Sequence, residues 1–355
     1  MNRLWLLLLV SGCAFSAPLQ SQQDNRFSLF GGFKADNQAQ VSISKPVSLP
    51  ADHAPHPGYQ IEWWYLTLLL ENDDGEPFNY QFTLFKFARP QLASNWGEGV
   101  VWMGHSSLHT QHQHYFAEKF AQQGTGIAGF SAAPVAFYID NWQWQSKPEA
   151  ALFPAELSTT SGPAALKLNL AASKPFVKHG QQGVSFKTGD GRYRSYYYSQ
   201  PFINASGQIT LNGVTHQVSG IGWYDHEWTS QLADEDALGW DWFSLHFDDG
   251  RKLMAFTMYV DGSEAYTTGT LISAQGEPQT LGPEELQILP LNTGEVAGRE
   301  IPVAWQIRIP KQHIDITTSA FKTEQWNNSR FPYYEGAMSF SGSHAGKGYM
   351  ELTGY

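Results

Sequence analysis

The chain has 355 residues, of which 42% are hydrophobic, 14% aromatic and 15% charged, which is enough for one large or two ordinary hydrophobic cores. Its formal net charge of −11 argues against the basic face that nucleic-acid phosphates require, so we expect no nucleic-acid partner. The same acidity disfavours direct adsorption to anionic lipid head groups.

The N-terminus resembles a bacterial lipoprotein export signal. Basic Arg3 precedes the apolar run Leu4–Val10, and Val10-Ser11-Gly12 leads into Cys13, the single cysteine of the chain. In such signals residues 1–12 are removed and the cysteine is acylated, and a lone cysteine has no intramolecular disulfide partner. The apolar run is too short to span a bilayer as a helix, so the predicted anchor is a lipid on Cys13.

The residue after Cys13 sets the expected location. Ala14 stands where an aspartate would favour retention at the inner membrane, so we expect the periplasmic face of the outer membrane. Cleavage after Ser16 or Ala17 would instead give a soluble periplasmic protein. Residues 13–57 are rich in Gln, Asn, Ser, Ala and Pro without a sustained period, which indicates a tether and an irregular N-terminal segment.

From residue 58 onward the hydrophobic period is mostly that of strands, with Gly and Asn/Asp turns at short intervals, and it predicts an all-β fold. Asn212-Gly213 predicts a type I′ hairpin turn. Alternating apolar residues in 131–173 predict turn-rich sheet with a turn at Asp140-Asn141. The best helix candidates are Tyr115–Gln123 and the region of Pro283-Glu284-Glu285.

A group of histidines could suggest a metal site. Their surroundings indicate a strand and then a loop, and no cysteine or nearby acid completes a tetrahedral set, so we interpret them as ordinary surface and barrel histidines. The sequence also lacks the motifs of serine hydrolases, zincins and nucleotide-binding proteins. We therefore expect no metal and no cofactor. The histidines are His105, His109, His112 and His114.

The chemically densest stretch is Gly220–Gln231, which reads G-I-G-W-Y-D-H-E-W-T-S-Q. In a strand its side chains alternate between two faces, one with Trp223, Asp225 and Glu227 and the other with Tyr224, His226 and Trp228. An acid between rings loses hydration and its pKa rises, which suits proton transfer. A buried acid that only braces the backbone is the alternative interpretation.

Two hairpins of the sequence repeat each other. Glu62-Trp63-Trp64-Tyr65 opens a strand that turns at Asp73-Asp74-Gly75, and Trp240-Asp241-Trp242-Phe243 opens one that turns at Asp248-Asp249-Gly250. The last strands also correspond, because Gly222-Trp223-Tyr224-Asp225 resembles Gly348-Tyr349-Met350-Glu351. We infer two similar β-units, 58–230 and 231–355; chance similarity of aromatic hairpins is the alternative.

Several ordered motifs together resemble one family. They are Glu62-Trp63-Trp64-Tyr65, Trp223-Tyr224-Asp225-His226-Glu227-Trp228, Gly239-Trp240-Asp241-Trp242, Tyr334-Glu335-Gly336 and Gly348-Tyr349-Met350-Glu351-Leu352-Thr353-Gly354-Tyr355. From about Tyr59 to Tyr355 the chain resembles the AttH-like/carotenoid 1,2-hydratase (hydroxyneurosporene synthase) superfamily, often labelled predicted secreted hydrolases. It departs from the family pattern at Tyr334-Glu335, where Trp-Glu is usual.

This resemblance implies a fold and a range of chemistries. The implied fold is two lipocalin-like antiparallel β-barrel units packed side by side, with few short helices and an aromatic cleft between them. Relatives add water to isoprenoid double bonds, and fungal relatives catalyse pericyclic cyclisations. The reaction itself does not transfer with the fold, because a fold fixes a scaffold and not a chemistry.

Hydration of an unactivated alkene needs a protonated acid in an apolar site, rings that stabilise a carbocation, and a directed water. We expect Asp225 or Glu227 to be the proton donor and His226 its partner, with Asp241 and Glu62 as further candidate acids. The expected substrate-binding residues are Glu62, Trp63, Trp64, Tyr65, Tyr197, Trp228, Trp240, Trp242, Tyr334 and Glu335.

Three classes of function remain open. The first is an enzyme that acts on a hydrophobic small molecule, with a hydratase favoured over a hydrolase because no nucleophile is visible. The second is a lipocalin-like carrier, which could use the same cleft without reacting. The third is an accessory lipoprotein of an ABC-type export system, which the resemblance suggests because relatives occur beside transporter components.

Anchoring by Cys13 gives a direct test. Cys13→Ser is expected to remove the acyl anchor and to leave residues 1–12 in place, because acylation and signal removal both need the thiol. Cell fractionation with intact-mass measurement reads out both effects. A variant that stays in the membrane at the wild-type mass would contradict the lipoprotein interpretation.

Overall fold

The computed structural model describes residues 38–94, 97–233 and 236–355, so Cys13, the predicted signal and most of the predicted tether lie outside the described residues. The described chain forms two antiparallel sheets, and its helical elements are two short 3₁₀ turns, η1 (Ala51–His53) and η2 (Pro310–Gln312). None of its helical segments has the length and apolar character needed to cross a membrane. The all-β prediction is confirmed.

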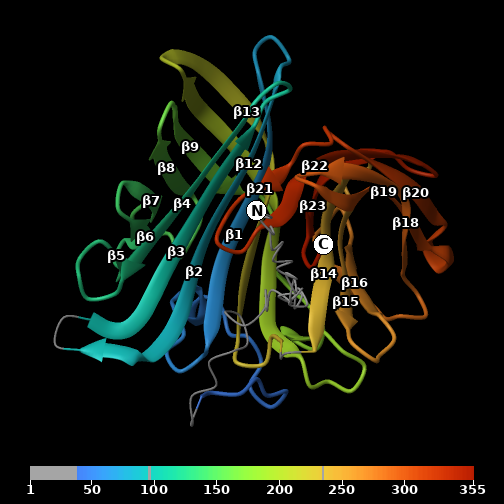
Figure 1. Cartoon of the computed structure of the whole chain (residues 1–355), viewed down its shortest axis with the longest axis horizontal. Coiled ribbons are helices and arrows are strands. Elements are labelled where there is room, and N and C mark those ends of the chain that lie inside the picture. The colour runs from blue at the N-terminus through green and yellow to red at the C-terminus, as the bar shows by residue number, and fades with distance from the viewer. Residues whose placement is uncertain (1–37, 95–96, 234–235) are drawn as a thin grey trace, which may run out of the picture.

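The first sheet has 13 strands and curls into a nearly closed barrel (Figure 1). Its order is β4-β3-β2-β1-β13-β12-β9-β8-β7-β6-β5, with β10 and β11 paired to β12, and β6 approaches β3 and β4 where the barrel nearly closes. The strands are β1 (Ile61–Asn72), β2 (Pro77–Ser94), β3 (Gly97–His109), β4 (His114–Gln122), β5 (Ala128–Ala132), β6 (Val135–Ile139), β7 (Trp142–Ser146), β8 (Ala155–Ser161), β9 (Ala164–Ala172), β10 (Val177–Lys178), β11 (Val184–Phe186), β12 (Arg194–Leu211) and β13 (Val214–Thr229).

The second sheet has 10 strands and forms a half-barrel beside the first (Figure 1). Its order is β17-β16-β15-β14-β23-β22-β20-β19-β18, with β21 paired to β22. The strands are β14 (Ala237–Phe247), β15 (Lys252–Val260), β16 (Tyr266–Ile272), β17 (Pro278–Leu281), β18 (Gln287–Val296), β19 (Arg299–Ile309), β20 (Ile314–Ala320), β21 (Trp326–Asn327), β22 (Tyr333–Gly342) and β23 (Gly346–Leu352).

The predicted turns are present, but the predicted helices are wrong. Asn212 and Gly213 join β12 to β13 with φ of 51° and 84°, as a type I′ turn requires. Residues 115–122 lie in β4, because pairing along β3 satisfies their backbone and overrides local propensity. Pro283–Glu285 is a single turn, closed where Leu286 N donates to Gly282 O over 3.2 Å.

The two repeated hairpins occupy corresponding places in the two sheets. β1 pairs with β2 on one side and β13 on the other, and β14 pairs likewise with β15 and β23. The strands that carry the Gly-aromatic-x-acid motif, β13 and β23, are therefore the inner neighbours of the two hairpins. The first sheet ends at Thr229 and the second begins at Ala237.

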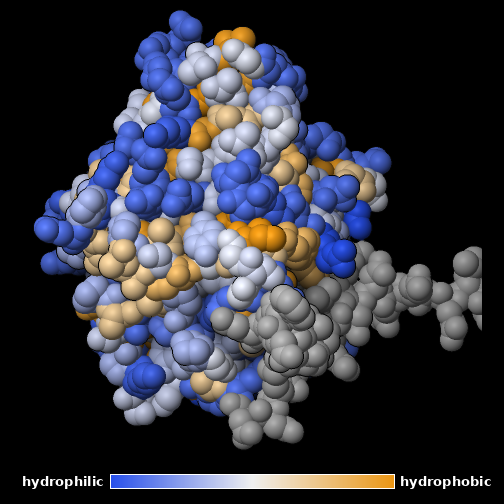
Figure 2. Space-filling model, turned by 90° about the vertical axis from the view of Figure 1, so that its left-hand side faces the viewer, coloured by the Kyte–Doolittle hydropathy of each residue, from blue (hydrophilic) through white to orange (hydrophobic). Residues whose placement is uncertain are grey.

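Strand alternation divides the apolar residues among three cores. One fills the barrel and includes Tyr224 and Trp228, and one fills the half-barrel. The third lies between the sheets, where Trp223 of the first meets Trp242 and Tyr349 of the second. The predicted two faces of 223–228 are confirmed, and the outward face of the barrel strand is covered by the other sheet. On the far side of the barrel the surface is mostly hydrophilic with small hydrophobic areas (Figure 2).

Residues 38–60 pack against one end of the barrel and bring His56 to Glu62, which His226 of β13 also contacts. The fully buried Glu62 carboxylate accepts hydrogen bonds from His56 Nδ1 (2.7 Å), the His56 backbone N (2.8 Å), His226 Nε2 (2.8 Å) and Lys86 Nζ (2.8 Å). Burial alone would raise the pKa of Glu62, but Lys86, His226 and His56 lower it below the usual range. Glu62 is therefore an ionised brace inside the barrel.

Removal of this charge should cost much of the barrel's stability. Glu62→Gln is expected to lower the free energy of unfolding by about 3–5 kcal/mol, since Lys86 stays buried without its counter-charge. Because the folded-state pKa of Glu62 is depressed, its stabilisation is present above the unfolded-state value and is lost as pH falls below about 4.5. Urea unfolding from neutral to acid pH measures both effects.

A surface ion pair provides the matched control. Glu156→Gln breaks the exposed pair with Lys167 (3.3 Å) and should cost under about 1 kcal/mol. Equal stability losses for the Glu62 and Glu156 variants would show that the buried network does not brace the barrel.

Candidate functional site

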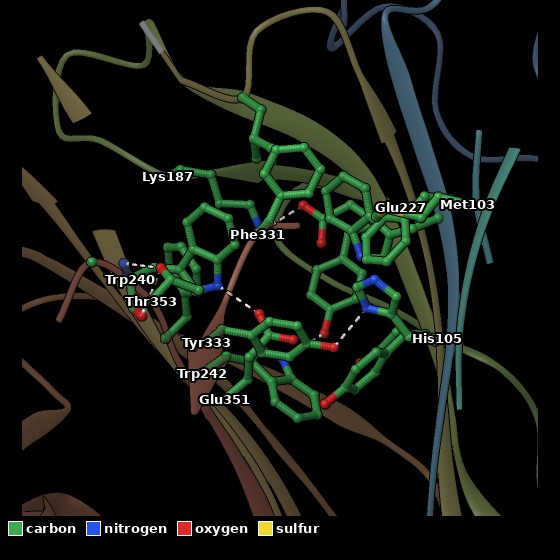
Figure 3. A pocket seen from close by; sticks show the side chains of 18 of the residues that line it. Met103, His105, Lys187, Glu227, Trp240, Trp242, Phe331, Tyr333, Glu351 and Thr353 are labelled. Carbon is green, nitrogen blue, oxygen red and sulfur yellow. Dashed lines mark hydrogen bonds and ion pairs between the residues drawn. The ribbon is translucent and has the colours of Figure 1, made fainter. Parts of the chain in front are cut away.

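A ring-lined pocket lies between the two sheets (Figure 3). Both sheets contribute side chains that face away from their own barrel interior, and residues 330–332 of the β21–β22 loop form part of its wall. The lining residues are Trp63, Tyr65, Phe85, Met103, His105, Lys187, Tyr197, Asp225, Glu227, Leu232, Trp240, Trp242, Phe256, Arg330, Phe331, Pro332, Tyr333, Glu351, Thr353 and Gly354.

Asp225 of β13 is the buried acid on the first sheet's side of the pocket. It is 3% exposed, and its Oδ1 accepts hydrogen bonds from Trp223 Nε1 (2.7 Å) and from Ser199 Oγ. Burial raises the pKa of Asp225 to about 7, although these two donors act in the opposite direction. Because its hydrogen-bond partners are neutral, Asp225 holds a proton for a large fraction of the time at neutral pH.

Glu351 of β23 is the corresponding acid on the second sheet. Trp240 Nε1 donates to its Oε1 over 2.8 Å, and burial raises the pKa of Glu351 to about 7. The strand registers correspond as well, since Tyr65 lies opposite Asp225 and Trp242 lies opposite Glu351. The Gly-aromatic-x-acid repeat thus places one protonatable carboxyl on each side of the same pocket.

A third acid, Glu335 of β22, lies behind the pocket wall. Tyr65 Oη donates to its Oε1 and Asn327 Nδ2 donates to its Oε2 over 2.8 Å. Burial and the nearby Glu351 raise the pKa of Glu335 well above its usual value. This carboxyl is a neutral group that ties β1 of the first sheet to β21 and β22 of the second.

Glu227, in contrast, is paired with a cation. Lys187 Nζ lies 2.8 Å from Glu227 Oε1, and Ser195 Oγ donates to the same oxygen. The Lys187 ammonium also lies 4.7 Å from the ring centres of Tyr197 and Phe256. This ion pair places a fixed dipole on the pocket wall (Figure 3).

His105 of β3 connects the pocket to the protein surface. Its Nδ1 lies 3.0 Å from Tyr333 Oη and its Nε2 lies 3.1 Å from Glu118 Oε1 (Figure 3 shows the first contact). The imidazole is 1% exposed, while the Glu118 side chain is 20% exposed. Burial lowers the pKa of His105, so the ring is neutral near neutral pH.

The structure brings together only part of the residue set predicted from the sequence. Four predicted residues lie inside the barrel instead, and the strand backbone separates His226 from Asp225 and Glu227. Asp241 bonds to Tyr259 Oη (2.6 Å) and Tyr355 Oη (3.0 Å) and is not among the pocket-lining residues, and Tyr334 lies in the half-barrel core. The predicted residues in the pocket are Trp63, Tyr65, Tyr197, Asp225, Glu227, Trp240 and Trp242, and those inside the barrel are Glu62, Trp64, His226 and Trp228.

Sequence reasoning missed several pocket residues. Glu351 was visible as the repeat partner of Asp225, and that equivalence is the signal that could have found it. His105 stands in the histidine group that we interpreted as ordinary. Lys187 and Tyr333 carry no local signal, because long-range packing alone brings them to the pocket.

One group of residues has the composition of a metal site. His56, Glu62 and His226 place ligand atoms within 4.8 Å of one another. However, both oxygens of Glu62 already accept two hydrogen bonds each, and one of the donors is the Lys86 ammonium. A bound cation would have to displace these bonds beside a positive charge, so the residues fit a metal poorly.

Comparison with known proteins identifies relatives of the whole fold. An AttH protein of Nitrosomonas europaea shares 30% sequence identity, with a TM-score of 0.80 over 89% of this chain and 99% of the other. Kievitone hydratase of Nectria haematococca has 18% identity and a TM-score of 0.68 over 91% of this chain and 98% of the other, which shows a shared fold. A comparison with curated protein sequences found no match.

The family assignment rests on nearly the whole described chain. The family model described as AttH-like matches residues 40–355, which includes both sheets and every residue of the pocket. Together with the geometry above, this confirms the resemblance indicated by the sequence motifs. The chain belongs to the AttH-like family.

Proposed function

We propose that this protein binds a hydrophobic, isoprenoid- or lipid-like small molecule between its two sheets and hydrates it by acid–base chemistry. The observation that carries the proposal is the pair of carboxyls, Asp225 and Glu351, whose pKa values are raised to about 7 in an aromatic pocket. A shared fold with a hydratase supports the reaction class by analogy.

Each part of the reaction has a group suited to it. Asp225 gives its proton to one carbon of the double bond, and the π electrons form the new C–H bond. The cation left on the other carbon faces indole and phenol rings such as Trp240, Trp242 and Tyr197, whose π faces stabilise positive charge. Water then adds its oxygen to that carbon and releases a proton, so the site returns to its starting charge.

A carrier without chemistry would use the same apolar pocket, and an accessory role in an ABC-type export system would also be compatible with it. The two protonated acids favour the enzyme, because a carrier of an apolar molecule has no need of buried carboxyls that cost desolvation energy. As to location, we propose an exported lipoprotein anchored through Cys13 at the periplasmic face of the outer membrane.

The donor assignment predicts the effect of removing one proton. Asp225→Asn keeps an oxygen that accepts from Trp223 and Ser199, so the protein should fold and bind ligand, while hydration should slow by at least about 100-fold. Incubation of linear isoprenoids in oxygen-18 water, followed by mass spectrometry of the products, measures the rate.

Asp241→Asn is the matched control. Asp241 is equally buried and its pKa is likewise raised to about 7, but it bonds to Tyr259 and Tyr355 outside the pocket. Its variant should hydrate at nearly the wild-type rate. If Asp225→Asn keeps full turnover while Glu351→Gln loses it, the donor is the other carboxyl and the assignment to Asp225 is wrong.

The raised pKa also fixes the direction of the pH dependence. The acid acts only when protonated, so hydration should be supported below about pH 7 and should fall as pH rises through the pKa of Asp225. Rates measured from pH 5 to pH 9, with ligand binding followed in parallel, test this decrease of the rate with rising pH. A rate that increases through that interval would contradict a carboxylic acid as the donor.

A further inference from the structure

Tyr333, His105 and Glu118 form a chain of hydrogen bonds that takes no part in the proton donation proposed for Asp225. Three elements contribute to it: Tyr333 begins β22 in the second sheet, whereas His105 and Glu118 lie opposite each other on β3 and β4 of the first. Tyr333 and His105 line the pocket, and Glu118 is partly exposed. The chain therefore runs from the pocket toward solvent.

The ionised state of Glu118 indicates which nitrogen of His105 carries the proton. Glu118 also accepts the backbone N–H of Arg330 (3.0 Å), and the pKa of Glu118 lies below its usual value because His105 and Arg330 outweigh the effect of burial. A carboxylate can only accept, so His105 Nε2 carries the proton. With a neutral ring, Nδ1 is bare and is placed to accept from Tyr333 Oη, which also has Asn327 and Glu335 as hydrogen-bond partners.

We propose that Tyr333, His105 and Glu118 form the base arm of the site, a relay that removes the proton from the water that adds to the substrate. This inference rests on the proposed hydration. Tyr333 is the catalytic residue of the arm because it faces the pocket; Glu118, which acts through His105, is a positioning residue.

The proton transfers balance without any further reactant. As the water oxygen bonds to the substrate cation, its proton passes to Tyr333 Oη while the Tyr333 proton passes to His105 Nδ1. The resulting imidazolium is stabilised by Glu118, as in other acid–histidine pairs. His105 then loses one proton to solvent, by exchange through Glu118 that restores its Nε2–H tautomer, and Asp225 takes up another, so the cycle closes with one water consumed.

The surroundings of the relay support a neutral phenol that passes protons on. Glu335 and Glu351 face Tyr333, and burial together with these acids raises the pKa of Tyr333 well above its usual value. The rings of Phe85 and Phe116 contact the His105 ring edge-on. Among the described residues, the charged group that His105 contacts on its solvent side is Glu118. Arg330 reaches this region through the loop bond to Glu118.

Turnover of isoprenoids in oxygen-18 water is the first test. Tyr333→Phe and Glu118→Gln should each lower kcat at least about tenfold with little change in KM. The wild-type rate should also fall at acid pH where His105 becomes protonated. Glu118→Gln should move this decrease of the rate to lower pH, and Tyr333→Phe should abolish the decrease. Tyr334→Phe, a change on the same strand that faces the half-barrel core, should leave the rate and the profile unchanged.

Ligand binding gives a second readout that needs no turnover. Tyr333 lines the pocket and is hydrogen-bonded to His105, Asn327 and Glu335, so a ligand hydroxyl can exchange for one of these partners at its phenol oxygen. Wild-type protein should bind farnesol about fivefold more tightly than farnesene, which lacks the hydroxyl. Tryptophan fluorescence titration measures both affinities. Tyr333→Phe should remove the preference, and Tyr334→Phe should keep it.

The outcomes separate this inference from the proposed function. Wild-type hydration with an unchanged rate and pH profile in folded Glu118→Gln and Tyr333→Phe would overturn the relay alone. Wild-type binding without any hydration would overturn the proposed function and the relay with it. Equal affinities of wild-type protein for farnesol and farnesene would also count against the relay, whatever the turnover.

Discussion

Burial of carboxyl groups, with or without a cation beside them, is the constraint on which this structure depends. Glu62 and Asp225 lie on paired strands and are both almost inaccessible to water. Lys86 and two imidazoles keep Glu62 ionised inside the barrel, whereas Asp225 meets only neutral donors and keeps a proton. Opposite faces of the same strand pair thus hold a structural charge and a chemical acid.

The two sheets resemble each other, so a buried carboxyl occurs at corresponding positions in both. A hairpin and the neighbouring Gly-aromatic-x-acid strand occur in each sheet, and the outward faces of these strands pack against each other. Asp225 and Glu351 consequently reach one pocket from two sides. Each accepts a hydrogen bond from an indole N–H, that of Trp223 for Asp225 and that of Trp240 for Glu351.

How far the sequence could predict this site depends on the range of the interactions. Alternation along β13 is local, and it placed Asp225 and Glu227 on one face and His226 on the other. The same alternation puts Trp240 and Trp242 in the pocket and Asp241 outside it, and applying it to β14 would have corrected the assignment of Asp241. Pairing across more than 200 residues, as between His105 and Tyr333, leaves no local pattern to read. The helix predicted at 115–123 failed for a similar reason, because its partner strand decides its conformation.

The β21–β22 loop, residues 328–332, leads to a last consequence. Phe331 and Pro332 supply pocket wall, yet the loop belongs to neither sheet and is held to the barrel by the bond from Arg330 N to Glu118. Part of the pocket wall is therefore formed by a segment that carries neither Asp225 nor Glu351. Exchange of this loop between family members would change which molecules enter while both strand-borne acids stay in place, so new specificities can arise without rebuilding the scaffold.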